Sequence, residues 1–139
     1  MFPVTTKILV VDDTALMRRM MMDFFSSQGY KKVVQAPDGA EAWLEIEKAE
    51  REKDPFTLII SDWNMPKLNG LDLLKKVRMT PFCASVPYIM LTAETEKDKV
   101  VEALQAGVTN YITKPFTNNT VQTKLKQVYD KLFPVKKAG

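Results

Sequence analysis

Residues 7–13 read Lys-Ile-Leu-Val-Val-Asp-Asp, a β-branched apolar run that ends in two adjacent carboxylates. Further along, Met17, Met20, Met21 and Phe24 recur with the spacing of one helix face. A short apolar run followed by a helical period indicates a buried strand and then an amphipathic helix. This strand–helix unit decides the fold because the rest of the chain repeats it.

The same alternation continues to residue 132. We expect further strands near residues 33–36, 58–61, 88–92 and 110–113, and further helices over residues 39–53, 70–79, 97–106 and 117–132. Alternating units of this kind form a parallel sheet with helices on both faces, because their crossovers are right-handed. The sequence therefore predicts a doubly wound α/β fold.

The size and composition are those of one ordinary globular domain. The chain has 139 residues, of which 27% are charged and 45% hydrophobic. We expect a single domain over residues 1–139 with no output domain. The apolar runs are far shorter than the roughly 20 residues that cross a bilayer, and no signal peptide opens the chain. A cytoplasmic location without membrane insertion is therefore expected.

Composition also excludes several classes of function. Cys83 is the one cysteine and histidine is absent, which excludes an intramolecular disulfide, the common zinc sites and His-dependent triads. Residues 1–70 carry 9 Lys/Arg against 11 Asp/Glu, whereas residues 71–139 carry 11 against 6. The positive charges are scattered and form no dense stripe, so we do not expect nucleic-acid binding.

Polar side chains stand at the end of four predicted strands. Asp12 and Asp13 follow the first, Asp62 the third, Thr92 the fourth and Lys114 the fifth. In an open parallel sheet, ligands bind where the carboxyl ends of the strands converge. We therefore expect these five side chains to form one site.

The chemistry of this set suits a metal ion and a phosphoryl group. Carboxylates forced together repel, and a hard cation such as Mg²⁺ relieves that repulsion. Asp13, Asp62 and a backbone carbonyl near Asn64 are candidate ligands, whereas a Ca²⁺ loop motif is absent. Lys114 and Thr92 can neutralise phosphoryl oxygens, and a carboxylate can serve as the phosphoryl acceptor. Asp62, on the central strand, is the best-placed acceptor.

Each of these residues also has an ordinary structural explanation. Asp12 and Asp13 can cap the first helix, Asp62 can begin an Asx-turn, and Lys114 before Pro115 can belong to a simple turn. Five such residues at corresponding strand ends are much less expected by chance than through a shared function. We therefore favour the functional interpretation.

The motifs over residues 7–132 resemble those of response-regulator receiver domains, and in particular of stand-alone chemotaxis regulators. The matching stretches are Asp12-Asp13, Asp62-Trp63-Asn64-Met65-Pro66, Gly70-Leu71, Thr92-Ala93-Glu94 and Lys114-Pro115-Phe116-Thr117. This resemblance implies a flavodoxin-like sheet in the order 2-1-3-4-5, which is known for the family and does not follow from the periodicity.

The resemblance also implies a role for each matching position. Asp62 is the phosphoacceptor, and one Mg²⁺ is held by Asp12, Asp13, Asp62 and the backbone carbonyl of Asn64. Thr92 and Lys114 contact the phosphoryl group. Tyr111 matches the family's switch aromatic, which turns inward when Thr92 moves towards the phosphoryl group. Apart from the resemblance, Asn64 and Glu94 flank the expected pocket and border the path of the hydrolytic water, so we expect them to modulate the phosphoryl lifetime.

The implied function is that of a phosphorylation-switched regulator in a two-component system, and not an enzyme with a released product. Its expected partners are a chemotaxis-type histidine kinase, a flagellar motor switch protein and a phosphatase, and we expect a monomer. The alternative is a phosphorelay intermediate that passes the phosphoryl group to a histidine phosphotransfer protein. A haloacid-dehalogenase-type phosphatase is disfavoured because it requires D-x-D, whereas Asp12 and Asp13 are adjacent.

Three further expectations concern surfaces. We predict a readout surface on the fourth helix, fifth strand and fifth helix, to which four lysines contribute: Lys97, Lys99, Lys124 and Lys126. Trp63, beside the acceptor, is expected to face solvent. Of the methionines in the first helix, Met22 is expected to be the most exposed.

Overall fold

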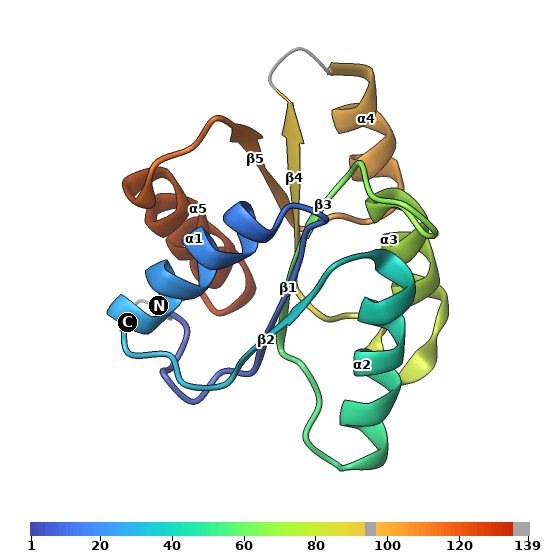
Figure 1. Cartoon of the computed structure of the whole chain (residues 1–139), viewed down its shortest axis with the longest axis horizontal. Helices are drawn as coiled ribbons and strands as arrows, with labels where there is room; N and C mark the ends of the chain where they lie inside the picture. Colours follow the sequence, from blue (N-terminus) through green and yellow to red (C-terminus); the bar gives the residue numbers. More distant parts are fainter. Residues whose placement is uncertain (94–96, 135–139) are drawn as a thin grey trace, which may run out of the picture.

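A five-stranded parallel sheet forms the centre of the computed structural model, which describes residues 1–93 and 97–134 (Figure 1). Its elements follow one another in the order β1 (Ile8–Val11), α1 (Ala15–Ser27), β2 (Val33–Ala36), α2 (Gly39–Arg51), β3 (Leu58–Asp62), α3 (Gly70–Met79), a 3-10 turn (Pro81–Cys83), β4 (Tyr88–Ala93), α4 (Lys97–Gln105), β5 (Asn110–Lys114) and α5 (Asn118–Leu132).

The strand order is β2-β1-β3-β4-β5, which confirms the predicted doubly wound α/β fold. In the parallel register Ile8 lies opposite Val33 on one side and Leu58 on the other. All four residues of β1 are fully buried, as expected for a strand covered on both faces. The strand that opens the sequence pattern is thus an inner strand of the sheet.

Helices cover both faces of the sheet and enclose two hydrophobic cores. The helices α1 and α5 lie on one face, whereas α2, α3 and α4 lie on the other (Figure 1). Phe25 of α1 and Val128 of α5 belong to the first core, and Ala42 of α2 and Leu74 of α3 to the second. Alternate residues of each inner strand point into one core or the other. The polar groups at the strand ends are therefore held by a sheet that is packed from both sides.

Three strands, β3, β4 and β5, extend one residue further towards the site than the sequence pattern indicates. The third strand includes Asp62 and the fifth includes Lys114, because the ladder continues past the predicted ends. The Trp63 amide donates to the Leu91 carbonyl at 3.1 Å, and Ala93 pairs with Lys114 in the parallel register. Asp62 and Lys114 are thus held by the sheet itself and not by mobile loops.

The prediction for the methionines of α1 is wrong. Met20 is 43% exposed and Met21 is buried, whereas Met22 is only partly exposed. The buried face of α1 consists of Met21, Phe24 and Phe25, so it is rotated away from Met20. Within residues 1–93 and 97–134, no helix is long and apolar enough to cross a membrane.

Candidate functional site

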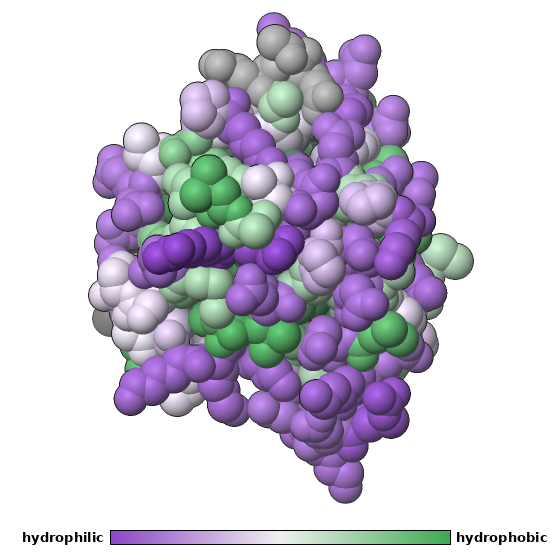
Figure 2. Space-filling model, viewed as in Figure 1, coloured by the Kyte–Doolittle hydropathy of each residue, from purple (hydrophilic) through white to green (hydrophobic). Residues whose placement is uncertain are grey.

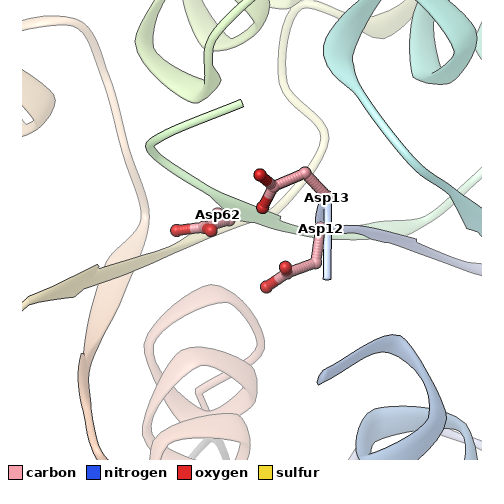
Figure 3. A group of neighbouring side chains, drawn as sticks. All are labelled: Asp12, Asp13 and Asp62. Carbon is pink, nitrogen blue, oxygen red and sulfur yellow. The ribbon is translucent and has the colours of Figure 1, made fainter. Parts of the chain in front are cut away.

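Three carboxylates meet at the carboxyl ends of β1 and β3. Asp12 and Asp13 follow β1 directly, and Asp62 is the last residue of the neighbouring strand β3. One oxygen from each carboxylate lies within 4.8 Å of the others (Figure 3). Asp12 and Asp62 are buried, whereas Asp13 is exposed. The predicted convergence of the acidic residues is therefore present in the structure.

Backbone contacts fix Asp12 at the start of the β1–α1 loop. Its Oδ1 atom accepts a hydrogen bond from the Thr14 amide two residues on at 2.9 Å, which is an Asx-turn in the loop before the helix. Arg18 from α1 donates to the Asp12 backbone carbonyl at 2.7 Å. The explanation of Asp12 as a helix cap is thus wrong, because Thr14 is the N-cap residue of α1, and the second oxygen of Asp12 contacts Lys114.

Lys114 brings a positive charge into the cluster. Its Nζ atom lies 3.0 Å from Asp62 Oδ2 and 3.5 Å from Asp12 Oδ2. The other oxygen of Asp62 accepts a hydrogen bond from the Trp63 amide at 2.8 Å. Each oxygen of Asp62 therefore has one donor, Lys114 for Oδ2 and the Trp63 amide for Oδ1.

Burial raises the pKa of the Asp62 carboxyl above its usual value, and the negative charge of Asp12 adds to this effect. The contacts with Lys114 and with the Trp63 amide act in the opposite direction without outweighing burial. The surroundings of Asp62 thus destabilise its ionised form relative to an exposed aspartate. A further cation would relieve this electrostatic cost.

Thr92 and Tyr111 lie on the two strands beyond Asp62. Thr92 is buried near the end of β4, one residue past Leu91, which pairs with Asp62. Tyr111 on β5 is half-buried and packs against the core between the sheet and α2 to α4. Lys124 of α5 places its ammonium 5.0 Å from the centre of the Tyr111 ring. Tyr111 thus connects the sheet to α5, on the surface predicted for readout.

Gly70 shapes the site in a way that residue chemistry alone does not reveal. A Cβ atom built at Gly70 would lie 2.2 Å from the Asp62 carbonyl oxygen, and the Gly70 amide donates to the Trp63 carbonyl at 2.8 Å. The first residue of α3 therefore packs directly on the backbone of the acceptor. The sequence motif includes Gly70 and so marks it as a residue of interest. The reason for a glycine there is the close contact between the α3 and β3 backbones, which only the structure shows.

The prediction that Trp63 faces solvent is wrong. Its side chain is 6% exposed and belongs to the core on the α2 to α4 side of the sheet. Lys99 of α4 lies over the indole, with Nζ 5.5 Å from the ring centre, and also donates to Asn64 Oδ1 at 3.2 Å. Lys99 thus reaches the edge of the site. Glu94, predicted to modulate phosphoryl lifetime, lies outside the described residues.

An apolar groove adjoins the site on the side of α1. It is lined by Met17 and Met20 of α1, by Lys114 at the end of β5 and by the two residues that follow it, Pro115 and Phe116. Leu16 of α1 is also 66% exposed. In Figure 2 a hydrophobic patch lies over the part of the molecule where Figure 1 places α1. The exposure of Met20 therefore belongs to a surface feature and is not an isolated exposed side chain.

The donor set fits a hard divalent cation. Mg²⁺ is bound through one or two carboxylates together with water and other oxygens, and the cluster of Asp12, Asp13 and Asp62 offers carboxylate oxygens that lie close together. Asp13 is exposed and so leaves the cluster accessible. These properties agree with a cation site that an incoming phosphorylated group can reach.

A model of the response regulator receiver domain matches residues 8–126, which is most of the chain. The chain belongs to this receiver-domain family. The predicted resemblance is thereby confirmed, and the acidic cluster lies at the strand ends where the family motifs placed it.

Similar proteins of known name are chemotaxis proteins. This receiver domain is 48% identical over 122 residues to the chemotaxis protein CheY1 of Helicobacter pylori, covering 88% of this chain and 95% of the relative. It is 45% identical to a CheY homolog of Campylobacter jejuni, covering 88% and 91%. These similarities support a chemotaxis response regulator of a two-component system.

The fold is also shared with a solved chemotaxis regulator. The structure of CheY4 of Vibrio cholerae superposes on this receiver domain with a TM-score of 0.80 and 37% sequence identity, covering 89% of this chain and 98% of that one. The flavodoxin-like fold predicted from the motifs is therefore confirmed.

Proposed function

We propose that this chain is a phosphorylation-activated chemotaxis regulator that accepts a phosphoryl group from a histidine kinase on Asp62. The observation that carries the proposal is the position of Asp62. It is buried among carboxylates at the end of an inner strand, and its Oδ2 atom lies 3.0 Å from Lys114 Nζ. The similarity to named chemotaxis proteins supports the same function.

The arrangement of donors assigns different tasks to the two oxygens of Asp62. The backbone amide of Trp63 holds Oδ1, which leaves Oδ2 to attack the phosphorus atom. The new bond joins Oδ2 to phosphorus while the bond from phosphorus to the histidine nitrogen of the kinase breaks, and the nitrogen retains the electron pair. Lys114 then balances the charge of the phosphoryl oxygens, as phosphoryl transfer requires.

The acidic cluster is of the kind in which receiver domains bind Mg²⁺. Asp12, Asp13, Asp62 and the backbone carbonyl of Asn64 would hold the ion, which supplies positive charge for the phosphoryl oxygens. Asp12 is fixed by Thr14 and Arg18, so it offers its remaining oxygen with little freedom to move away.

Signal transmission in this proposal begins at Thr92. Its hydroxyl follows the phosphoryl group, and Tyr111 on the adjacent strand turns inward to fill the vacated space. The readout surface formed by α4, β5 and α5 changes as a result. Exposed apolar side chains on α4, Val101 and Leu104, give this surface contact area, and the exposed Lys97 and Lys126 give it positive charge.

The first test is phosphoryl labelling. With Mg²⁺ and a small phosphodonor such as acetyl phosphate, the wild-type chain becomes labelled, and Asp62→Asn abolishes the label because an amide cannot act as the acceptor. Asp23→Asn, which changes an exposed aspartate of α1, serves as the matched control and retains the label. Undiminished labelling of Asp62→Asn would exclude Asp62 as the acceptor.

The second test separates chemotaxis from a phosphorelay. The chain is loaded with beryllofluoride, which mimics the acyl phosphate, and offered to a flagellar motor switch protein and to a histidine phosphotransfer protein. We expect beryllofluoride-dependent binding of the motor protein, weakened in Lys97→Gln and Lys126→Gln while their labelling stays intact. Preferred binding of the phosphotransfer protein would support the phosphorelay alternative.

A further inference from the structure

Lys99 joins helix α4 to the two residues that follow the proposed acceptor. Its ammonium donates to Asn64 Oδ1 at 3.2 Å and lies 5.5 Å from the centre of the Trp63 ring. The side chain is half-buried, and the Trp63 indole beneath it is 6% exposed. A lysine that reaches back from α4 to the β3–α3 loop is thus part of the surroundings of the site.

The chemistry of the two side chains fixes which end of the Asn64 carboxamide is engaged. A lysine ammonium carries three donors and no acceptor, so it can bind only the carboxamide oxygen. That oxygen is also the one side-chain atom of Asn64 that accepts a hydrogen bond. An oxygen that already accepts a hydrogen bond from an ammonium is a poorer acceptor for a second donor.

We propose that Lys99 is a positioning residue that prolongs the acyl phosphate on Asp62 by engaging Asn64 Oδ1, an inference that rests on the proposed function. Hydrolysis forms a bond from a water oxygen to phosphorus and breaks the bond from phosphorus to Asp62. The electron pair returns to the carboxylate, and the water protons leave with inorganic phosphate and solvent. Lys99 occupies one of the two lone pairs of Oδ1, so the atom orients an attacking water less well than a free Oδ1 atom does.

The variant Lys99→Met removes the ammonium and retains an apolar side chain over Trp63. Each protein is labelled with acetyl phosphate and Mg²⁺, the donor is removed, and loss of the label is followed. We expect loss about fivefold faster than in wild type, the effect of one hydrogen bond on a rate. Lys75→Met, which removes an exposed lysine of α3, leaves the lifetime unchanged.

A double-mutant cycle distinguishes positioning from a general effect of charge. In an Asn64→Ala background there is no Oδ1 atom to release, so Lys99→Met is expected to leave the lifetime as it is in Asn64→Ala alone. If Lys99→Met shortens the lifetime equally in both backgrounds, or if it does not shorten it in the wild-type background, the inference is overturned.

The contact itself is tested without phosphorylation. Trp43 and Trp63 are the two tryptophans, so a Trp43→Phe background reports Trp63 alone. Lys99→Met should shift the Trp63 emission, whereas Lys75→Met should not, and equal spectra would overturn the inference. If the wild-type chain takes no label, the proposed function fails together with this inference. Normal labelling with an unaltered lifetime in Lys99→Met would reject the inference alone.

Discussion

Two aspartates at opposite ends of β3 have opposite electrostatic surroundings. Asp62, at the carboxyl end, is buried beside Asp12, and burial raises its pKa. Asp54, before the amino end, is partly exposed between two lysines, and its pKa is lowered, first by the hydrogen bond with Lys32 and also by Lys7. The same residue type thus bears an electrostatic cost at one end and a favourable pairing at the other.

The neighbouring groups extend this contrast. At the amino ends of β1, β3 and β4, aromatic side chains such as Phe2, Phe56 and Phe133 line a mostly apolar cavity of about 590 Å³. Arg78 donates there to the carbonyls of Ala84, Val86 and Gly107. At this end the guanidinium pairs with neutral carbonyls, whereas at the carboxyl end three carboxylates lie close together beside the single ammonium of Lys114. The amino ends of the strands therefore belong to the structural scaffold, and the carboxyl ends carry the candidate site.

The largest expected effect lies in the scaffold. Arg78→Met should lower the free energy of unfolding by about 3 kcal/mol, because three carbonyls lose a charged donor in a partly buried place. Urea unfolding measures the change. Arg19→Met, at an exposed position of α1, should remain close to wild type. An equally small effect of Arg78→Met would show that water replaces the guanidinium at little cost.

The next effect lies at the site. Mg²⁺ at ten times its dissociation constant should stabilise the fold by about 1.4 kcal/mol, provided that it binds only the folded chain. The shift is measured by thermal unfolding and is reversed by a chelator. Asp13→Asn should reduce this shift sharply, because it removes one of the three carboxylates of the cluster. Asp130→Asn, at an exposed position of α5, should retain the shift. Equal shifts in both variants would place the ion elsewhere.

Much of the fold could be predicted because its signals are local. The run from Ile8 to Val11 is apolar at every position, which is typical of a strand buried on both faces. The ends of the strands were harder to predict from the sequence. The ladder continues through Asp62 to the Trp63 amide, and this continuation depends on the neighbouring strand, which no local pattern in β3 encodes.

The candidate site was predictable where parallel strands alone bring residues together. Asp12, Asp13 and Asp62 converge for that reason. The contacts of Lys99 and Arg78, and the burial of Trp63, depend on packing between segments far apart in the sequence. No spacing rule in the sequence indicates such packing. The contacts of Lys99 and Arg78 were therefore missed, and the burial of Trp63 was predicted wrongly.

The smallest expected effects concern the pH dependence of stability caused by the two aspartates at the ends of β3. A raised pKa means that folded Asp62 binds its proton more tightly than the unfolded chain does, so stability falls as pH rises from the usual value of 3.8 to the raised value. Asp62→Asn lacks this loss. In chelator, it should be about 1 kcal/mol more stable than wild type at neutral pH, the scale of ordinary single substitutions. The advantage should vanish in acid.

Asp54→Asn should behave in the opposite sense. Because the pKa of Asp54 is lowered, its ionised form favours the folded chain, and this contribution disappears as pH falls below the usual value of 3.8. Asp54→Asn should therefore be less stable than wild type at neutral pH and equal to it in strong acid. Added salt should shrink the difference, because the pairs with Lys7 and Lys32 are solvent-exposed at Asp54. Parallel pH profiles for Asp62→Asn and Asp54→Asn would refute the electrostatic contrast between the two ends of β3.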